Sequence, residues 1–355
     1  MKILITGLCG FVGSSLAYAL RDRLENVEIF GVDNLSRAGS ESNRGALRRA
    51  GFRLFYGDLR IASDLEALPD ADWVIDAAAN PSVLAGVDGK SSSRQLVEHN
   101  LWSVLNTLEY CRRCSAGVII LSSSRVYSVP TLAALPVRVE ETSFQLDTSQ
   151  TQPVGVTSNG ISEQFSVMPP LSLYGSTKLA AETMALEYGS TFRFPVWVNR
   201  CGVLAGAGQF GTAEQGIFSY WIHAHASGRP LRYIGFDGCG RQVRDAFHPD
   251  DLAALIVVQM RGPASNEVVF NVGGGISNAR SLAQLTEWCN HEFGARSPVP
   301  DLNPRPFDVP WLVMDASAAR QQFCWKPMRS IDSIFEEIAK HVRDHPDWLD
   351  RCGVT

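Results

Sequence analysis

This sequence of 355 residues has little that would direct it to a membrane or to a nucleic acid. No apolar run approaches the ~20 residues that a membrane-spanning helix needs, and the apolar start is too short for a signal peptide. The formal net charge is −5, from 32 Lys and Arg against 37 Asp and Glu, and no basic stripe is present. We therefore predict a cytoplasmic protein with no membrane and no nucleic acid among its partners.

The cysteines also lack the spacing of a metal site. Eight are scattered along the chain, and only Cys111 and Cys114 form a C-x-x-C, inside a helical pattern and without a second pair. A structural zinc site needs four ligands, so we predict no metal and reduced thiols. The apolar content of 45% and the charged content of 19% are those of an ordinary globular protein with one large domain or two.

The first 33 residues carry the clearest pattern. An apolar run at 2–6 leads into glycines at 7, 10 and 13, then a helical pattern to about residue 24 and a second apolar run. Gly7 permits a sharp turn, Gly10 lets the backbone approach a pyrophosphate, and Gly13 lets the helix pack closely on the strand. The free N–H groups of the helix N-terminus would face the pyrophosphate. This order predicts a dinucleotide site.

An acidic residue at the end of the second apolar run indicates which dinucleotide. Asp33 follows Gly13 by 20 residues and is placed to accept hydrogen bonds from a ribose 2′-hydroxyl, which favours NAD over NADP. Arg37 could instead meet a 2′-phosphate, but Asp33 lies nearer the strand end. A tight turn that binds nothing is the alternative interpretation of the glycines. We predict NAD.

Strand-like and helical segments alternate along the chain, which predicts an α/β fold with a parallel sheet covered on both faces. A helix is expected at about 41–50, with strands at 52–56 and 73–76. Asp58 and the small residues Ala77–Ala79 follow these strands, at the edge where ligands of such sheets bind. We predict that Asp58 meets an adenine amino group and that the alanine run meets a flat dinucleotide, although ordinary loop chemistry explains each alone.

Later segments continue this pattern. Apolar residues recur at helical spacing from 94 to about 114, and a strand at 117–121 ends at the serines 122–124. Residues 128–170 are rich in Pro, Thr and Ser, and we predict a long irregular segment there. Loops of this length are usually functional or disordered, and this one leads into the most reactive stretch of the chain. We therefore expect it to form part of an active-site wall.

Tyr174 and Lys178 open a helical pattern that runs to about residue 188. Residues four apart lie on one face of a helix, so the phenol and the ammonium can face one cavity. A buried lysine cation stabilises a phenolate, which then serves as a base for a hydroxyl proton. A Y-x-x-x-K alone is usually a surface pair, but the glycine turn and the strand-end serines upstream favour the catalytic interpretation.

These motifs together resemble the extended short-chain dehydrogenase/reductases, and among them the NAD-dependent nucleotide-sugar epimerases and dehydratases. The resemblance covers almost the whole chain. The segments that most resemble the CDP-paratose (CDP-tyvelose) 2-epimerases are Asp33-Asn34-Leu35-Ser36-Arg37, Ala79-Asn80-Pro81-Ser82-Val83, Ser123-Ser124-Arg125-Val126-Tyr127, Asn199-Arg200-Cys201-Gly202-Val203 and Gly208-Gln209-Phe210-Gly211. The resemblance implies a Rossmann-type doubly wound parallel sheet with a smaller C-terminal α/β cap that binds substrate.

The resemblance also implies residue roles. Tyr174 would be the base and acid at the sugar hydroxyl, Lys178 would hold the nicotinamide ribose, and Ser123 would hydrogen-bond the reacting oxygen, with Ser124 as the alternative. The predicted cofactor contacts are Gly7, Cys9, Gly10, Phe11, Val12, Gly13, Asp33, Asn34, Ser36, Arg37, Asp58, Leu59, Ala77, Ala78, Ala79, Asn100, Ser122, Tyr174, Lys178 and Cys201. The predicted substrate contacts are Pro81, Ser82, Ser123, Ser124, Arg125, Gln209, Arg232, Arg244 and Arg305.

Several of these positions have alternative interpretations. Arg244 and Arg305 match positions that clamp a diphosphate, and their alternative is surface ion pairs with Asp245 and Asp308. Aromatic residues between 208 and 221 (Phe210, Phe218, Tyr220, Trp221) could wall a loosely held sugar or simply pack in the core.

Two positions depart from the family pattern. Relatives often carry His where Asp76 stands, which changes the chemistry at that strand end. Many relatives carry Asn where this chain has Val203, and that Asn commonly touches the substrate diphosphate. This contact must be made differently here.

The predicted function is that of an epimerase that holds NAD⁺ tightly, oxidises C2 of a CDP-linked (deoxy)hexose to a 2-keto sugar and returns the hydride to the other face. A 4,6-dehydratase is disfavoured because Ser124-Arg125 stands where an acidic pair is expected. A nucleotide-sugar 4-epimerase, a ketoreductase and a non-catalytic NAD(P)-binding regulatory protein are the alternatives.

We expect an NAD-binding domain (1–198 plus 236–270), a nucleotide-sugar-binding domain (199–235 plus 271–346) and a tail (347–355). The helices after Arg94 and Tyr174 are rich in apolar residues, and Trp102 lies outside the core stripe of the first. They could pair with a second subunit as a four-helix bundle, and the resemblance favours a homodimer or homotetramer. Buried helices of a large monomer would look the same.

Overall fold

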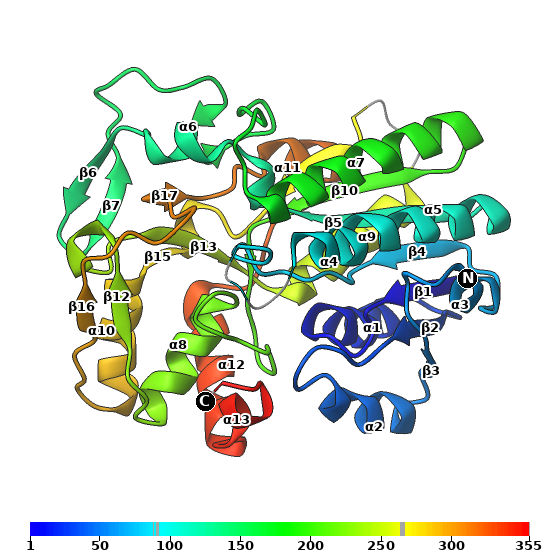
Figure 1. Cartoon of the computed structure of the whole chain (residues 1–355), viewed down its shortest axis with the longest axis horizontal. Coiled ribbons are helices and arrows are strands. Elements are labelled where there is room, and N and C mark those ends of the chain that lie inside the picture. The colour runs from blue at the N-terminus through cyan, green and yellow to red at the C-terminus, as the bar shows by residue number, and fades with distance from the viewer. Residues whose placement is uncertain (88, 90–91, 263–266, 355) are drawn as a thin grey trace.

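The computed structural model describes residues 1–87, 89, 92–262 and 267–354. Its centre is a sheet of seven parallel strands in the spatial order β14-β10-β5-β4-β1-β2-β3 (Figure 1). The strands are β1 (Lys2–Thr6), β2 (Glu28–Asp33), β3 (Arg53–Tyr56), β4 (Trp73–Asp76), β5 (Gly117–Ser123), β10 (Val196–Cys201) and β14 (Val269–Val272). The direction of winding reverses between β1 and β4, where ligands of doubly wound sheets bind. The predicted fold class is confirmed.

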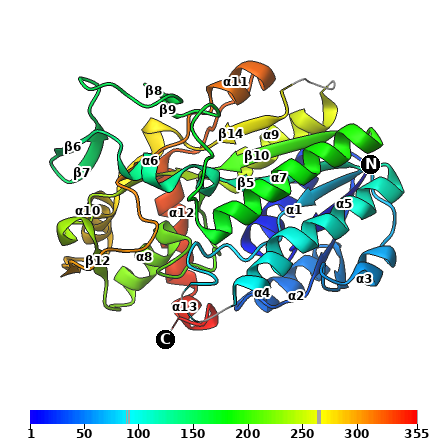
Figure 2. The same cartoon turned by 45° about the horizontal axis from the view of Figure 1, so that its top comes forward.

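Helices cover both faces of this sheet, which is why β1 and β5 are nearly continuous apolar runs. One face packs against α1 (Phe11–Arg23), α2 (Glu41–Arg49), α9 (Pro249–Arg261) and α11 (Ser317–Phe323). The other face packs against α3 (Ala62–Glu66), α5 (Ser103–Cys114) and α7 (Leu173–Phe192), and Figure 2 shows α5 and α7 lying side by side over the strands. None of the helices that the structure describes is both long and apolar enough to cross a bilayer.

The helix expected from 94 to about 114 is confirmed, but it contains one wider turn. It consists of α4 (Ser93–Val97), a π-helical turn at Glu98–Trp102 and α5. The turn buries Asn100, whose amide holds the backbone of Asn80: Oδ1 accepts from the N–H at 2.7 Å and Nδ2 donates to the carbonyl at 2.9 Å. Apolar spacing did not reveal the π-helical turn because a single wider turn within a helix barely changes which residues face the core.

The prediction for residues 128–170 was wrong on two points. The segment contains α6 (Val129–Ala133), a hairpin of β6 (Val137–Glu140) and β7 (Ser143–Leu146), and a second hairpin of β8 (Val156–Thr157) and β9 (Gly160–Ile161). None of it lines the large cavity described below. It packs instead around β17 (Trp311–Leu312) in an apolar cluster of its own, which accounts for its length.

The C-terminal half of the chain forms the cap. Its strands are β11 (Val203–Leu204), β12 (Arg232–Ile234), β13 (Val243–Phe247), β15 (Ala279–Ser281), β16 (Val299–Asp301) and β17, and its helices are α8 (Ile217–Ala226), α10 (Leu282–Phe293), α12 (Ile331–Asp344) and α13 (Trp348–Arg351). These helices share an apolar cluster that is separate from those of the sheet. The expected domain boundaries after 198 and 270 fall inside β10 and β14, so the division into domains stays a proposal.

The residues expected as a tail are packed onto the molecule. Residues 348–351 form α13, and Trp348 stacks on Phe210 with ring centroids 5.4 Å apart. Trp348 is buried in a small apolar cluster with Phe210, and Leu349 is buried in the cluster of the cap helices. Thr355 lies outside the described residues.

Candidate active site

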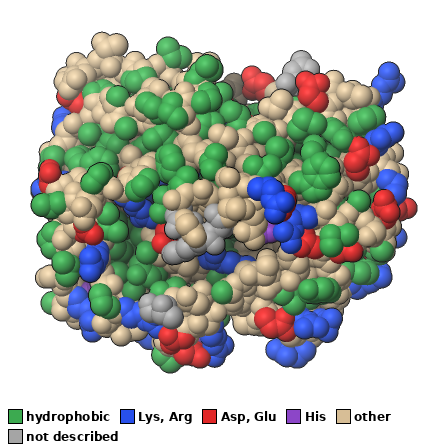
Figure 3. Space-filling view, in the orientation of Figure 1, with side chains coloured by type: hydrophobic (Ala, Val, Ile, Leu, Met, Phe, Trp, Pro, Cys, Tyr) green, Lys and Arg blue, Asp and Glu red, His purple; other side chains and the backbone are tan. Residues whose placement is uncertain are grey.

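A cavity of about 900 Å³ lies between the carboxyl edge of the sheet and the cap. On the face drawn in Figure 3, the molecule is hollowed near its centre, and Lys and Arg side chains are visible at the hollow. One end of the cavity is the glycine turn with Asp33 and Ala77–Ala79, which we call the glycine end. The other is formed by Arg125, Gln242, Arg244, Arg305 and Asp308, which we call the arginine end. Tyr174 and Lys178 line the cavity together with both ends.

At the glycine end the backbone is exposed to the cavity because the glycines have no side chains to cover it. Gly7 has a φ of +65°, and its N–H bonds to the carbonyl of Val32 at 2.9 Å. A Cβ on Gly13 would lie 2.2 Å from the carbonyl oxygen of Gly7, so only glycine lets α1 start this close to β1. The N-terminus of α1 therefore opens onto the cavity, as a dinucleotide pyrophosphate requires. These residues fit NAD.

Asp33 holds this turn through hydrogen bonds and also lines the cavity. Its Oδ2 accepts from the N–H of Cys9 and its Oδ1 from the N–H of Leu35, both at 2.8 Å. Burial raises the pKa of this carboxyl, and the backbone donors oppose that shift. Each oxygen keeps capacity to accept a ribose hydroxyl. Arg37 also lines the cavity, is half-buried and donates to the carbonyl of Phe210, so one of its donors is already used within the protein.

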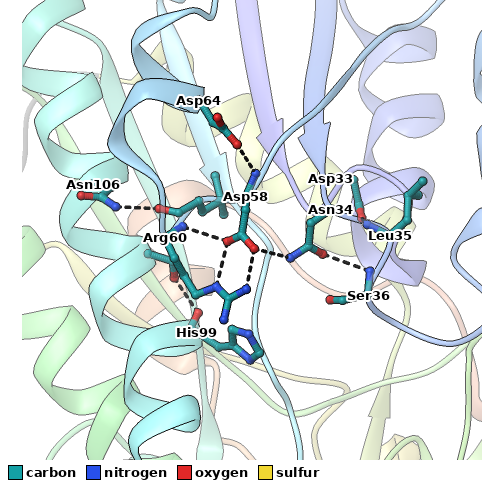
Figure 4. Close-up of polar contacts among 11 residues, drawn as sticks. Asp33, Asn34, Leu35, Ser36, Asp58, Arg60, Asp64, His99 and Asn106 are labelled. Carbon is teal, nitrogen blue, oxygen red and sulfur yellow. Dashed lines mark hydrogen bonds and ion pairs between the residues drawn. The ribbon is translucent and has the colours of Figure 1, made fainter.

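Asp58 also lines the cavity, but its carboxylate already has partners (Figure 4). Arg60 donates to both oxygens, and Asn34 donates to Oδ2 at 3.2 Å. These donors, Arg60 foremost, hold the pKa of Asp58 well below its usual range. The neighbouring Asn34 in turn accepts from the N–H of Ser36. The predicted contact of Asp58 with an adenine amino group would have to be added to this ion pair.

The start of α7 brings the catalytic candidates together. Ser172 caps the helix by accepting from the N–H of Gly175 at 3.0 Å, and a Cβ on Gly175 would lie 2.2 Å from the carbonyl oxygen of Arg125. This close approach places Tyr174 beside the segment that begins at Ser123. Lys178, only 2% exposed, donates from Nζ to the carbonyl of Leu121 at 2.8 Å. Ser123, Tyr174 and Lys178 all line the cavity.

Three guanidiniums gather at the arginine end. Arg244 pairs with Asp308 at 3.0 Å, Arg125 donates to the carbonyl of Phe307 at 3.1 Å, and Arg305 donates to the carbonyl of Ala213 at 2.9 Å. Burial lowers the pKa of Arg125 to about 10, and Arg244 and Arg305 add to that shift while Asp308 opposes it. Three cations and one anion leave this group with a formal charge of +2. Such a group is suited to an anionic ligand.

The alternative for Arg244, a surface ion pair with Asp245, does not form. The Arg244 side chain is only 12% exposed, and it pairs with Asp308. Asp245 turns the other way, where its Oδ2 accepts from the N–H of Gly275 at 3.1 Å. Burial raises the pKa of Asp245 to about 6. Adjacent residues on a strand point to opposite faces, which explains the separation.

Most of the predicted contacts line the cavity, but three do not. Cys9 is buried beneath the glycine turn, Asn100 holds the backbone of Asn80, and Ser82 lies off the cavity wall. Ser122 lines the cavity while its hydroxyl donates to Glu182. The wall also includes residues that were not predicted as ligand contacts: Arg60, Gln95, His99, Ser103, Glu214, Gln215, Gln242, Arg280, Phe307 and Asp308.

Gln242 is the most informative of these additional residues. Its Nε2 donates to the carbonyl of Ile234 at 2.8 Å and to Asp308 at 3.1 Å. Its buried Oε1 has no hydrogen-bond partner among the described residues. Because the donor side is fixed, this amide offers only an acceptor to a ligand. Its position two residues before Arg244, on the same side of an extended chain, was the signal that could have identified it.

The aromatic residues of the cap serve mainly as core. Phe218 and Trp221 are buried in the cluster between the cap helices, which supports the packing interpretation, although both also reach the cavity wall. Val203 lines the cavity near them without a polar group. Among the described residues, no three His, Cys, Asp or Glu side chains are arranged to hold a metal ion.

Comparisons with known proteins agree with this geometry. The family described as NAD dependent epimerase/dehydratase family matches residues 3–273. CDP-paratose 2-epimerase of Salmonella typhi is 29% identical over 352 residues, covering 92% of this chain and 95% of the relative. UDP-glucuronate 4-epimerase of Thermodesulfobacterium geofontis is 25% identical over 338 residues, covering 93% and 92%. The fold is similar to the crystal structure of UDP-glucuronic acid 4-epimerase from Bacillus cereus with UDP-glucuronic acid and NAD, with a TM-score of 0.78, 24% identity and coverage of 97% and 99%.

Proposed function

The chain belongs to the NAD dependent epimerase/dehydratase family, and from that premise we propose that this enzyme inverts C2 of a CDP-linked (deoxy)hexose. The observation that carries the proposal is that Ser123, Tyr174 and Lys178 line one cavity with the glycine turn and with a cationic group suited to a diphosphate. The similarity to CDP-paratose 2-epimerase supports the choice of C2 and of a CDP-linked substrate.

Residues that line the cavity have separate roles in the proposed reaction. When bound, NAD supplies the hydride acceptor and donor. Tyr174 takes the proton of the C2 hydroxyl and later returns it, and Ser123 donates a hydrogen bond to the same oxygen. The buried ammonium of Lys178 stabilises the charge that develops on Tyr174. The resulting 2-keto sugar then turns so that its other face meets the cofactor.

Arg125, Arg244 and Arg305 hold the diphosphate of the substrate in this proposal. A diphosphate bridging two sugars carries two negative charges near neutral pH, which offsets the formal +2 of the arginine end. These guanidiniums replace the contact that an Asn at position 203 makes in many relatives. The anchor is therefore strong at the nucleotide, and the sugar stays free to turn.

The cofactor is proposed to stay bound through turnover. Arg37, in the loop after β2, donates to the carbonyl of Phe210 in the cap. Trp348 stacks on Phe210, so the C-terminal helix supports this bridge from outside. Such a closure slows cofactor release, which an epimerase that regenerates its own cofactor can tolerate.

A 4-epimerase acting on a UDP-sugar is the second candidate, because UDP-glucuronate 4-epimerase is also a relative of this chain. Both reactions use the same base and cofactor, and they differ in which carbon of the sugar faces Tyr174. Arg125 near Tyr174 would suit a sugar carboxylate in that case.

The deciding experiment is NMR of the purified protein, without added NAD, incubated with CDP-paratose, CDP-glucose, GDP-mannose, UDP-glucose and UDP-glucuronate. Inversion at C2 of a CDP-sugar is the expected result. Inversion at C4 would replace the proposal with the second candidate. Turnover only after NADH or NADPH is supplied would indicate a ketoreductase. Tyr174→Phe serves as the inactive control.

We also propose a homodimer or homotetramer that assembles through α5 and α7, and a cytoplasmic location. Trp102, in the π-helical turn beside α5, is 53% exposed, and Leu173 and Phe192 at the two ends of α7 are each 40% exposed. Apolar side chains exposed along two neighbouring helices suit a four-helix interface. Analytical ultracentrifugation of the wild type and of Trp102→Glu tests this: the variant should sediment as a smaller species.

A further inference from the structure

A buried carboxylate lies behind the catalytic candidates. Asp76 ends β4 and is 1% exposed, flanked by Thr6 of β1 and Ile120 of β5 in the sheet register. Val74, two residues earlier on the same face, packs in the apolar cluster that includes Ala181 of α7. Because side chains alternate along a strand, Asp76 points toward the layer of α5 and α7, from which Lys178 also reaches the sheet.

One oxygen of Asp76 is fixed by Thr6. The Thr6 hydroxyl accepts from the N–H groups of Ala77 and Ala78, each at 3.1 Å. Its own proton is therefore directed to Asp76 Oδ1, 2.8 Å away. Asp76 thus holds the alanine run of the glycine end in place through a single hydroxyl.

The other oxygen, Oδ2, is buried and has no hydrogen-bond partner among the described residues. Lys178 supplies the positive charge that acts on it: burial raises the pKa of Asp76, and Lys178 opposes that shift. The ammonium of Lys178 bonds to the carbonyl of Leu121, the residue that follows Ile120 on the neighbouring strand. A buried ammonium requires a counter-charge, and a neutral carbonyl does not supply one.

Other titratable groups in this layer are either paired or neutral. Glu182, one turn after Lys178, is held by Arg200 through Nε at 3.1 Å and Nη2 at 2.7 Å, so its charge is already balanced. The titratable group that faces Asp76 from α5 is Cys111, whose pKa is raised by burial and further by Asp76. Cys201 of β10 is a second buried thiol near Lys178, and burial raises its pKa to about 12 while Lys178 opposes that shift. Neutral thiols add no charge, so among these groups Asp76 is the carboxyl left to balance Lys178.

We propose that Asp76 is the counter-ion of Lys178 and a positioning residue for the reaction: it balances the ammonium that lines the cavity with Tyr174 and, through Thr6, fixes the wall on which the cofactor lies. The catalytic consequence rests on the proposed roles of Tyr174 and Lys178. The ion pair itself does not, so the two can fail separately.

A double-mutant cycle on thermal stability tests the pair without any activity. Asp76→Asn and Lys178→Met should each lower the melting temperature, because each leaves one buried charge unbalanced. The double variant should lose clearly less than the sum of the two, which is the signature of direct coupling. Asp72→Asn, an exposed carboxylate at the other end of β4, is the matched control and should change little. Additive losses would overturn the pair.

Turnover then tests the positioning role. Asp76→Asn keeps an oxygen for Thr6 but removes the charge, so kcat should fall about tenfold and the alkaline limb of its pH profile should move down by about one pH unit. The KM for the nucleotide sugar should stay within a factor of two to three. Thr6→Val breaks the hydroxyl link but leaves the charge, so it should lower NAD retention without moving the alkaline limb. An unshifted limb in Asp76→Asn would contradict the role.

If Asp76→Asn does not fold, Lys178→Met alone still tests whether Asp76 and Lys178 are coupled. In Lys178→Met the buried carboxyl has no counter-ion and is best accommodated protonated. The deficit in melting temperature relative to the wild type should therefore shrink as the pH is lowered from about 8 to about 5. A deficit that does not change over this range would show that Asp76 and Lys178 are not coupled.

Discussion

The two ends of the cavity are built by different means. At the glycine end the walls are backbone and small side chains that follow one another along β1, β2 and β4, and the approach is set by missing Cβ atoms. At the arginine end the walls are guanidiniums and an amide from distant segments: Arg125 bonds to Phe307, 182 positions away. The first end offers donors fixed in the main chain, and the second offers charges on side chains.

This difference has a physical consequence for each ligand. Main-chain N–H groups at a helix N-terminus move little, so the glycine end suits a cofactor that stays in one pose. Long arginine side chains hold an anion firmly but leave a neutral sugar unconstrained. An epimerase needs both properties at once, because the cofactor must stay still while the sugar turns.

The largest expected effect is that of replacing Tyr174, which lines the cavity together with both ends. Tyr174→Phe removes the proposed base and should lower kcat by about 10²- to 10³-fold, while the affinity for CDP stays unchanged. NMR turnover assays and calorimetry measure the two quantities. Tyr188→Phe, later on the same helix, should keep full activity. A Phe variant with normal turnover would remove Tyr174 from the chemistry.

One added methyl group at Gly13 should disrupt the glycine end and weaken NAD binding. The Cβ of Gly13→Ala would meet the carbonyl oxygen of Gly7 at 2.2 Å, so α1 must shift and NAD affinity should fall roughly 100-fold. Calorimetric titration with NAD measures this. Gly45→Ala, within α2, meets only the end of the Arg49 side chain at 3.3 Å and should be neutral or slightly stabilising. Equal behaviour of the two variants would show that the close approach is not needed.

At the arginine end, single substitutions should weaken binding without abolishing it. Arg244→Ala removes charge-assisted hydrogen bonds worth about 1.5–3 kcal/mol, so the Kd for CDP should rise about tenfold or more. NAD affinity should stay the same, which separates the two ends. Arg296→Ala, an exposed arginine of the cap, is the control and should leave both affinities unchanged. A loss of NAD affinity in Arg244→Ala would contradict the division.

The smallest expected effect concerns acid stability of the cap. Burial lowers the pKa of His223 to about 3 and that of His341 to about 4, and the two rings are linked by a 3.3 Å contact between their nitrogens. Below the ordinary value of 6.5 the unfolded chain binds protons that the folded cap does not, so stability should fall as pH drops from 6.5 toward 4. Melting temperatures across this range should decline by several degrees.

Replacing both histidines isolates this effect. The double variant His223→Asn/His341→Asn should show a flatter dependence of melting temperature on pH than the wild type, because two of the buried imidazoles that resist protonation are then gone and His225, whose pKa burial also lowers, is left. His291→Asn on the exposed side of α10 should follow the wild type. If the double variant keeps the slope of the wild type, the acid sensitivity comes from elsewhere than the cap.

Local sequence pattern was sufficient to predict the elements that carry the cofactor turn and the catalytic candidates. The glycine turn, the strand that ends at Asp33 and the helix that carries Tyr174 and Lys178 lie where the sequence predicts them, because their geometry depends on neighbours within a few residues. The segment 128–170 was mistaken for an irregular wall, since two short hairpins carry too few residues to display an alternating pattern.

Tertiary structure decided the rest. The sequence by itself determined the fold class, the family and the position of the cofactor turn, because glycines and apolar periodicity act locally. Only the folded chain brought Asp308 rather than Asp245 to Arg244, turned Arg37 toward Phe210, and buried both Asp76 and Lys178. Electrostatic partners are chosen by distance in space and by burial, and neither quantity can be read from separation along the chain.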